Sequence, residues 1–408
     1  MNRQSTQRAP AAATFIFGVL RGLKVGTLSL DLPDGSTRQF GTESTLAASL
    51  KIHDWRVFSR LLKGGDIAFA ECFIEGLWST PNLAAVIELA ARNRAVLARA
   101  IYGSWWGQLA YRVKHLIKRN TATQARRNIA AHYDLGNDFY ALWLDPSMTY
   151  SSALFNGDLS LSLEAAQANK YRRIIAQLQI IPGAQILEIG CGWGGFAELA
   201  AREAHAHTRG ITLSTEQLAY AQARLDQAGI AHQANLTLTD YRDMGIKPDE
   251  RFDHIVSIEM FEAVGEAYWD DYFACVKRCL KPGGTAVVQT ITIADELFVQ
   301  YRTGTDFIQQ FIFPGGMLPS PSEFRRRATR AGLEVIHEHA FGLDYAATLA
   351  RWHVAFLAHE AQVRALKPAN GKPAFDDAFI RTWVFYLAYC EGAFRAGSID
   401  VMQFGLRA

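Results

Sequence analysis

The chain has 408 residues and a mass of 45.3 kDa, with 49% hydrophobic and 20% charged residues. This composition excludes a disordered or collagen-like chain and allows two or three domains. The net charge is only +2, but residues 1–131 hold 18 Lys and Arg against 8 Asp and Glu, whereas the remainder hold 24 against 32. This asymmetry predicts that the first third of the chain meets an anionic surface.

The local sequence indicates neither export nor metal binding. The early apolar run at residues 9–20 is shorter than the roughly 20 residues that span a bilayer, and no small-residue cleavage site follows it. The five cysteines form neither a disulfide framework nor a C-x-x-C zinc pattern. These features predict a reduced, cytoplasmic protein without a metal site.

The first 130 residues are predicted to form a basic domain. Alternating apolar and polar residues from Val25 predict a strand that ends in a turn at 33–35, and residues 83–100 predict a helix. Between residues 95 and 127, seven basic residues are interleaved with Tyr and Trp and no acid occurs. Such a segment is typical of an interfacial helix on an anionic membrane, and the alternative is a solvated basic helix packed against its own domain. No nucleic-acid-binding signature accompanies the charge.

From about residue 184, apolar strand-like runs alternate with helical segments. Helices are predicted at 196–204 and 215–227, and at about 294–330 and 345–397 between later strands. The strands are predicted near residues 184–190, 208–213, 235–240, 252–258, 285–293, 333–338 and 401–406. This alternation predicts βαβ units and a parallel sheet with helices on both faces.

A glycine-rich loop, Glu188-Ile-Gly-Cys-Gly-Trp-Gly-Gly195, joins the first of these strands to a helix. Its glycines let the backbone approach a ligand that a Cβ would exclude. The spacing departs from the G-x-G-x-x-G of nicotinamide-binding proteins, and the strand ends in an acid that can pair with the ammonium group of a ligand. The alternative interpretation is that these glycines only end a strand.

Further motifs follow in a fixed order along the chain. They are His132-Tyr-Asp-Leu-Gly-Asn-Asp-Phe-Tyr140, Leu144-Asp-Pro-Ser-Met-Thr-Tyr-Ser151, Gly210-Ile-Thr-Leu-Ser-Thr-Glu-Gln217, Asp240-Tyr-Arg-Asp243, Met260-Phe-Glu-Ala-Val-Gly265, Phe311-Ile-Phe-Pro-Gly-Gly316 and Gly392-Ala-Phe-Arg395. The glycine loop resembles the first motif of class I S-adenosylmethionine-dependent methyltransferases. The ordered set resembles the cyclopropane-fatty-acyl-phospholipid synthase family, which includes the mycolic acid methyltransferases.

The resemblance implies the fold and the reaction. The fold class would be α/β: a Rossmann-like methyltransferase sheet with a helical lid insertion over residues 131–408, after a smaller α+β domain at 1–130 that binds lipid. The enzyme would transfer a methyl(ene) carbon from S-adenosylmethionine to the cis double bond of a phospholipid acyl chain, giving a cyclopropane through a carbocation. The 12% aromatic residues fit an acyl-chain tunnel, or are simply core.

The resemblance also implies partners and a cofactor site. The partners would be unsaturated phospholipids of an anionic membrane, with the protein bound at the membrane surface, and a homodimer is allowed. The residues that would bind the cofactor are Tyr133, Tyr150, Ser151, Glu188, Gly190, Gly192, Gly194, Thr212, Gln217, Asp240 and Tyr241. Among these, Asp240 and Tyr241 would lie near the adenine.

The same resemblance implies a bound bicarbonate as the general base. Its holders would be Glu262, Tyr345, the backbone of Ile291, and the residues at positions 152 and 289. The family usually has Cys and His at those two positions, where this chain has Ser152 and Gln289. A backbone contact survives the first change, whereas Gln289 can donate a hydrogen bond but cannot shuttle a proton.

Alternatives therefore remain open on the sequence. A different deprotonation would give a methyl-branched or methylene fatty acid. Because a fold alone does not determine the substrate, a methyltransferase acting on a small molecule or a protein is a second possibility. A membrane-binding module with an inactive site is the third.

Overall fold

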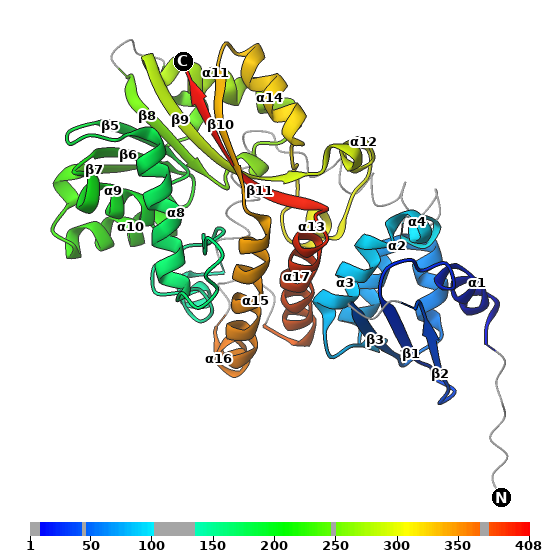
Figure 1. The fold of residues 1–408 in the computed structure, drawn as a ribbon. Helices are drawn as coiled ribbons and strands as arrows, with labels where there is room; N and C mark the ends of the chain where they lie inside the picture. The colour runs from blue at the N-terminus through cyan, green and yellow to red at the C-terminus, as the bar shows by residue number, and fades with distance from the viewer. Residues whose placement is uncertain (1–8, 43–45, 102–134, 246–249, 368–374) are drawn as a thin grey trace, which may run out of the picture. The chain divides into compact units, whose positions relative to one another are not determined.

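The computed structural model describes residues 9–42, 46–101, 135–245, 250–367 and 375–408 (Figure 1). Tyr133 and most of the basic, aromatic segment at 95–127 lie outside the described residues, so the predictions made for them are not addressed by the structure. The chain divides into two compact units, which are taken here in turn. No described helix is both long and apolar enough to cross a membrane.

The first unit is an α+β unit built on a four-stranded sheet of order β2-β1-β3-β4. Its strands are β1 (Thr27–Asp31), β2 (Thr37–Phe40), β3 (Ala47–Ile52) and β4 (Trp78–Ser79). Its helices are α1 (Ala11–Leu20), α2 (Arg56–Ile74), α3 (Leu83–Arg92), α4 (Arg94–Ile101), α13 (Phe307–Phe311) and α17 (Asp377–Arg395). The strand predicted from Val25 is β1.

The helix predicted over 83–100 is two helices, α3 and α4, which meet at Asn93. The buried Asn93 side chain accepts hydrogen bonds from the backbone N–H groups of Lys24 and Val25, at 2.8 and 3.1 Å, and donates to the Val25 carbonyl at 2.8 Å. An asparagine that satisfies backbone groups of a distant segment in this way interrupts the helix without leaving polar atoms unpaired.

The domain boundaries differ from the prediction of one unit before residue 130 and one after it. Residues 300–312 and 373–398 belong to the first unit, although they follow the glycine-rich loop in the sequence. The reason is apolar packing: Phe385 of α17 lies 5.7 Å from Phe73 of α2 and 4.7 Å from Phe307 of α13, measured between ring centroids. Aromatic contacts of this kind stabilise the association of segments that are distant in sequence.

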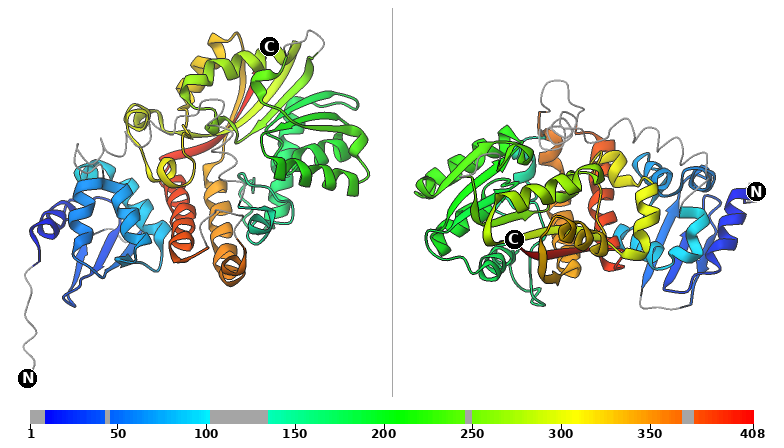
Figure 2. Two further views of the ribbon diagram at one scale, coloured as in Figure 1. Left: turned by 180° about the vertical axis from the view of Figure 1, so that it is seen from behind. Right: turned by 90° about the horizontal axis from the view of Figure 1, so that it is seen from above.

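The second unit contains a seven-stranded sheet of order β10-β11-β9-β8-β5-β6-β7 (Figures 1 and 2). Its strands are β5 (Gln185–Ile189), β6 (His207–Thr212), β7 (Ala234–Leu238), β8 (Phe252–Ile258), β9 (Leu280–Ile293), β10 (Glu334–Ala340) and β11 (Ile399–Arg407). The five strands β5 to β9 are parallel, as predicted. The sheet is nevertheless mixed, because β11 runs antiparallel to both of its neighbours.

Helices cover both faces of this sheet. They are α8 (Leu163–Leu178), α9 (Gly195–Ala204), α10 (Thr215–Gln227), α11 (Trp269–Cys279) and α14 (Pro321–Arg330). The further described helices are α7 (Asn137–Ala141), α15 (Gly342–Ala358), α16 (Glu360–Ala365) and α12 (Asp295–Thr303), which follows β9. On one face, α8 and α9 pack Ile174 and Phe196 against Ile186 of β5. On the other face, Phe324 of α14 stacks on Phe404 of β11 at 4.0 Å.

Candidate cofactor and active site

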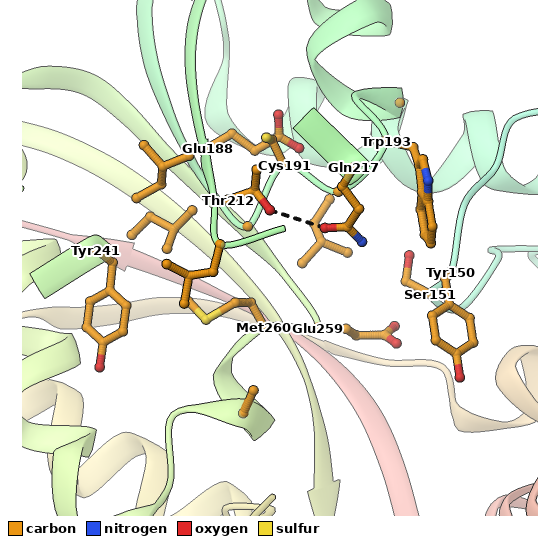
Figure 3. Close-up of a pocket in the computed structure, with 18 of the residues that line it drawn as sticks. Tyr150, Ser151, Glu188, Cys191, Trp193, Thr212, Gln217, Tyr241, Glu259 and Met260 are labelled. Carbon is orange, nitrogen blue, oxygen red and sulfur yellow. Dashed lines mark hydrogen bonds between the residues drawn. The ribbon is translucent and has the colours of Figure 1, made fainter. Parts of the chain in front are cut away.

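A cavity opens at the carboxyl ends of β5, β6 and β8, the edge where ligands bind in open α/β sheets (Figure 3). Eight of the residues predicted to bind the cofactor line it: Tyr150, Ser151, Glu188, Gly190, Gly192, Thr212, Gln217 and Tyr241. Two others, Gly194 and Asp240, are not among the described residues that line it. The sequence motifs thus converge on one cavity, with two exceptions that have local explanations.

The glycines of the loop have different tasks. Gly190 has a φ of +85°, and a Cβ there would meet Met260 at 3.0 Å. Gly192 has a φ of +51° and open space where its Cβ would be, so a ligand can approach its backbone. Gly194 is the N-cap residue of helix α9 with a φ of +81°, and a Cβ there would lie 3.0 Å from Ala221 of α10. Gly194 therefore serves helix packing and not the wall of the cavity.

Asp240 also serves a local role. Its carboxylate accepts hydrogen bonds from the Arg242 guanidinium at 2.6 and 2.8 Å and from the Arg242 backbone N–H at 3.1 Å. These contacts turn the side chain toward its own turn, while the next residue, Tyr241, lines the cavity. Of the two residues predicted to lie near the adenine, only Tyr241 is among the described residues that line the cavity, and the adenine contact stays a prediction.

Glu188 presents an unsatisfied carboxylate to the cavity. It is buried at the end of β5, and its Oε2 atom has no hydrogen-bond partner among the described residues. Burial raises the pKa of this carboxyl well above its ordinary value, and the positive charge of Arg224 only partly opposes this effect. A buried acceptor without a donor costs free energy that a bound ammonium or hydroxyl group would recover. Glu188 and the open backbone at Gly192 therefore fit the polar groups of S-adenosylmethionine.

A second carboxylate, Glu259, lies at the end of β8 and was not predicted. It lines the cavity and points toward the side that carries Tyr150 and Ser151 (Figure 3). Three groups donate hydrogen bonds to it: the Ser152 N–H at 2.9 Å, Gln289 Nε2 at 2.8 Å and the Tyr345 hydroxyl at 2.6 Å. These are three of the groups that the family resemblance assigned to bicarbonate, so in this chain a side-chain carboxylate accepts their hydrogen bonds.

The backbone conformation aims Glu259 into the cavity. Its φ is +50°, a left-handed value that is uncommon for residues other than glycine and is concentrated at functional sites. Burial raises the pKa of its carboxyl, whereas Lys170, Tyr345, Ser152 and Gln289 lower it. The sequence signal that could have found it is an acid directly after a predicted buried strand, the pattern that identified Glu188.

Glu262, the acid that the sequence favoured, lies three residues after Glu259, and its buried Oε2 atom has no hydrogen-bond partner among the described residues. Its Oε1 accepts a hydrogen bond from the Ile291 N–H at 2.5 Å, and it is not among the residues that line the cavity. Burial, followed by the nearby charge of Glu259, raises its pKa to about 8. Where two buried carboxyl groups are close together, one of them holds a proton. With a pKa of about 8, Glu262 holds its proton at neutral pH.

We expect Glu262→Gln to change how stability depends on pH. The pKa of Glu262 is raised from 4.5 to about 8 on folding, so its contribution to stability is greatest below pH 4.5 and falls as the pH rises toward 8. The variant loses this dependence. Its free energy of unfolding, measured in urea relative to the parent chain, should increase by about 2–3 kcal/mol between about pH 6 and about pH 9. A constant difference would contradict a buried, protonated Glu262.

A buried lysine beneath the cavity was also missed by the sequence analysis. Lys170 of α8 is fully buried, and its Nζ donates to Ser151 Oγ at 2.5 Å and to Gln167 Oε1 at 2.7 Å. Gln167 in turn donates to the Ser151 carbonyl at 2.8 Å. Burial lowers the pKa of Lys170 to about 7, opposed by the charges of Glu259 and Asp145. This network holds the segment that supplies Tyr150, Ser151 and the Ser152 N–H.

Aromatic rings continue from the cavity toward Tyr345. Tyr150 lies 5.5 Å from Trp143 and 5.4 Å from Trp352, and Trp352 lies 6.1 Å from Tyr345, between ring centroids. Tyr140 lies 5.5 Å from Tyr150 and 5.2 Å from Trp193. Ring faces of this kind stabilise a nearby positive charge. The acyl-chain tunnel itself stays a prediction.

Residues 120–404 match the mycolic acid cyclopropane synthetase family. The chain belongs to this family. It is 36% identical over 388 residues to the tuberculostearic acid methyltransferase of Mycobacterium tuberculosis, covering 93% of this chain and 87% of that protein. It is 33% identical over 367 residues to the cyclopropane-fatty-acyl-phospholipid synthase of Escherichia coli K12, covering 87% of each.

Solved structures agree with this assignment. The cyclopropane synthase MmaA2 of Mycobacterium tuberculosis is 30% identical, with a TM-score of 0.63 over 69% of this chain and 98% of that one. The mycolic acid cyclopropane synthase CmaA1, complexed with SAH and CTAB, is 32% identical, with a TM-score of 0.62 over 69% of this chain and 98% of that one. This family member is thus an S-adenosylmethionine-dependent fatty-acid-modifying methyltransferase with the predicted class I fold.

Proposed function

We propose that this methyltransferase alkylates the cis double bond of an unsaturated acyl chain on a phospholipid, with Glu259 as the general base. The observation that carries the proposal is the Glu259 carboxylate, which lines the cofactor cavity while three donors fix its orientation. A carboxylate in that place is suited to removing a proton beside the methyl-transfer site. The relative in Escherichia coli is named for its action on phospholipids.

The residues divide the chemistry among them. S-adenosylmethionine, when bound, supplies a methyl group attached to a positively charged sulfur. Methylation of an alkene leaves a positive charge on the neighbouring carbon, and the faces of Tyr150 and Trp352 would shield it from water. Glu259 then takes a proton from the carbocation, so the acyl chain gains one carbon and two hydrogens. Glu262 stays protonated and adds no second negative charge at the base.

We further propose that the reaction needs no bicarbonate, the general base implied by the family resemblance. Ser152, Gln289 and Tyr345 already donate to Glu259, so their capacity to hold a free anion is taken up. A second anion beside a buried carboxylate would also be repelled at close range in a low dielectric. Turnover should therefore be the same in bicarbonate-free buffer and in buffer with added bicarbonate.

The proposed product retains a double bond, as a methylene or methyl-substituted acyl chain. Glu259 is tied by three hydrogen bonds, and Gln289 beside it cannot pass a proton onward. Slow removal of the proton gives the carbocation time to rearrange by a hydride shift, and proton loss then leaves an alkene. The second candidate product is a cyclopropane, because a base that lines the cofactor cavity could instead take the proton from the newly added methyl group.

The membrane partner is proposed from charge. The surplus of basic residues before residue 131 would hold the protein on the surface of an anionic leaflet, where each lysine or arginine contributes about 1 kcal/mol. Cosedimentation with vesicles containing phosphatidylglycerol, but not with vesicles of phosphatidylcholine alone, is expected. Equal binding to both would argue against electrostatic docking.

The test of the proposed function is mass spectrometry of phospholipid acyl chains from a host that lacks such enzymes. Expression should add a CH₂ unit to monounsaturated chains. Mild catalytic hydrogenation then separates the products, because an alkene takes up two further hydrogens and a ring does not. Unmodified chains in cells with soluble, cofactor-binding protein would contradict the proposed substrate.

We expect Gln289→His to raise the cyclopropane share in the same assay. A histidine can accept a proton as well as donate a hydrogen bond, so it offers the relay that glutamine lacks. The ratio of hydrogenation-resistant to hydrogenation-sensitive product measures the effect. An identical product ratio in the variant and the parent chain would remove position 289 from the control of the product.

A further inference from the structure

A line of hydrogen bonds connects Glu259 to helix α8 through two strands. Gln289 of β9 donates from Nε2 to Glu259, and its Oε1 accepts from Gln403 Nε2 at 3.0 Å. Gln403 Oε1 in turn accepts from Arg173 Nε at 3.1 Å. Gln289 and Gln403 are direct partners in the register between β9 and β11, and both are completely buried. The antiparallel insertion of β11 thus places one buried amide against another.

The chemistry of the two ends sets the direction of every bond in the line. A guanidinium only donates hydrogen bonds and a carboxylate only accepts them. Gln403 must therefore turn its oxygen toward Arg173 and its N–H toward Gln289. Gln289 must then accept with its oxygen, which leaves its own N–H for Glu259. An amide without such a constraint can rotate and present its oxygen instead, and an oxygen facing a carboxylate is repulsive.

We propose that Gln403 and Arg173 are positioning residues that hold the Gln289 amide with its N–H directed at Glu259. The proposal rests on the proposed role of Glu259 as the base, because neither residue lines the cofactor cavity. Alternation along β11 is consistent with this role: Phe404 faces α14 on one side of the sheet, and its neighbour Gln403 faces Arg173 of α8 on the other. The position of Gln403 is therefore fixed by the sheet.

The proposal predicts a measurable effect on the base. The Gln289 N–H is one of the groups that lower the pKa of Glu259. Without Gln403 the Gln289 amide is free to rotate, so this pKa should rise and the acid limb of the pH–rate profile should move to higher pH. The other charged and titratable groups near Glu259 are Lys170 of α8, Glu262 of the same loop and Tyr345 of α15. All three remain in every variant below.

The experiment compares Gln403→Met with a matched control, Gln177→Met. Gln177 is one turn after Arg173 on α8, and neither atom of its amide has a hydrogen-bond partner among the described residues. Both replacements exchange a glutamine for an unbranched apolar side chain of similar length. Turnover is followed as release of S-adenosylhomocysteine on dioleoyl phosphatidylglycerol vesicles, and cofactor affinity is measured by calorimetry.

Gln403→Met should lower kcat on the order of tenfold with unchanged cofactor affinity. It should also move the acid limb of the pH–rate profile to higher pH. Gln177→Met should do neither. The double variant Gln289→Met/Gln403→Met should be no slower than Gln289→Met alone, because Gln403 acts only through Gln289. Should Gln403→Met fail to fold, Arg173→Lys at the half-buried end of the line should give a smaller shift in the same direction.

An unchanged pH profile in Gln403→Met or in Arg173→Lys, or additive losses in the double variant, would overturn the positioning role. That outcome is distinct from failure of the proposed function. If Glu259→Gln is inactive while the Gln403 variant behaves as the parent chain, the proposed role of Glu259 as the base is supported. Only its positioning through Gln403 is then contradicted. If Glu259→Gln retains full activity, the role of the base fails and the positioning role fails with it.

Discussion

Glu259→Gln is expected to lower turnover by about 10³-fold while leaving cofactor affinity within a few-fold of the parent value. The amide has the shape of the carboxylate but cannot take a proton. Its oxygen can accept from the Ser152 N–H and from Gln289, and its NH₂ can donate to the Tyr345 oxygen, since a hydroxyl both donates and accepts. The hydrogen-bond network therefore survives, and the loss of activity reports on proton removal alone.

The measurements are single-turnover rates on unsaturated phospholipid vesicles and calorimetric binding of S-adenosylhomocysteine. Glu296→Gln is the control, because Glu296 is an exposed acid of α12 that does not line the cavity. Adding bicarbonate to Glu259→Gln gives a second readout. Restored turnover would show that a free anion can act in place of the missing carboxylate, whereas near-parental activity without any anion would eliminate Glu259 as the base.

Lys170→Met should alter both cofactor binding and the pH dependence of the reaction. Lys170 holds Ser151 at the cavity wall, and its charge lowers the pKa of Glu259. Its removal should weaken cofactor binding on the order of tenfold and move the acid limb of the pH–rate profile upward. The pKa of Lys170 itself is about 7, so in the parent chain its positive charge should be lost as the pH rises through 7. The effect of that charge on Glu259 should disappear with it, and the variant should show no such change around pH 7.

Stability provides an independent check on Lys170. Its pKa falls from 10.5 to about 7 on folding, so between these values the unfolded chain binds more protons than the folded one. Its contribution to the free energy of unfolding therefore rises with pH across that window, and Lys170→Met should flatten the rise. Lys51→Met, at an exposed lysine of β3, is the control. Equal pH dependence in the two variants would contradict a buried lysine with a lowered pKa.

The local sequence was sufficient to predict residues of the proposed cofactor site that line the cavity. An apolar run that ends in an acid, followed by closely spaced glycines and a helix, predicts a ligand at Glu188 and Gly192, and both line the cavity. Strand and helix periodicity also located β5 to β9 closely, with β8 at the predicted residues 252–258. These features follow from short-range rules, because hydrophobic period and backbone freedom are properties of consecutive residues.

The surroundings of Glu259, the proposed base, depend on contacts that no local pattern contains. Glu259 becomes the centre of the site because a left-handed backbone turns it into the cavity, where Ser152, Gln289 and Tyr345 reach it from three other segments. Glu262, three residues later, has an equally acidic side chain but turns toward the Ile291 backbone. Two acids in one motif are chemically alike in sequence, and only the direction of each side chain distinguishes them.

By itself, the sequence determined the class I sheet, the glycine-rich loop and membership of a lipid-modifying methyltransferase family. The tertiary structure decided which acid of the Met260 motif region lines the cavity, that β11 inserts antiparallel beside β9, and that α13 and α17 join the first unit. The physical reason is the range of the interactions. Periodicity and turn chemistry act between near neighbours, whereas strand order, aromatic packing and buried hydrogen bonds join residues more than a hundred positions apart, such as Gln289 and Gln403.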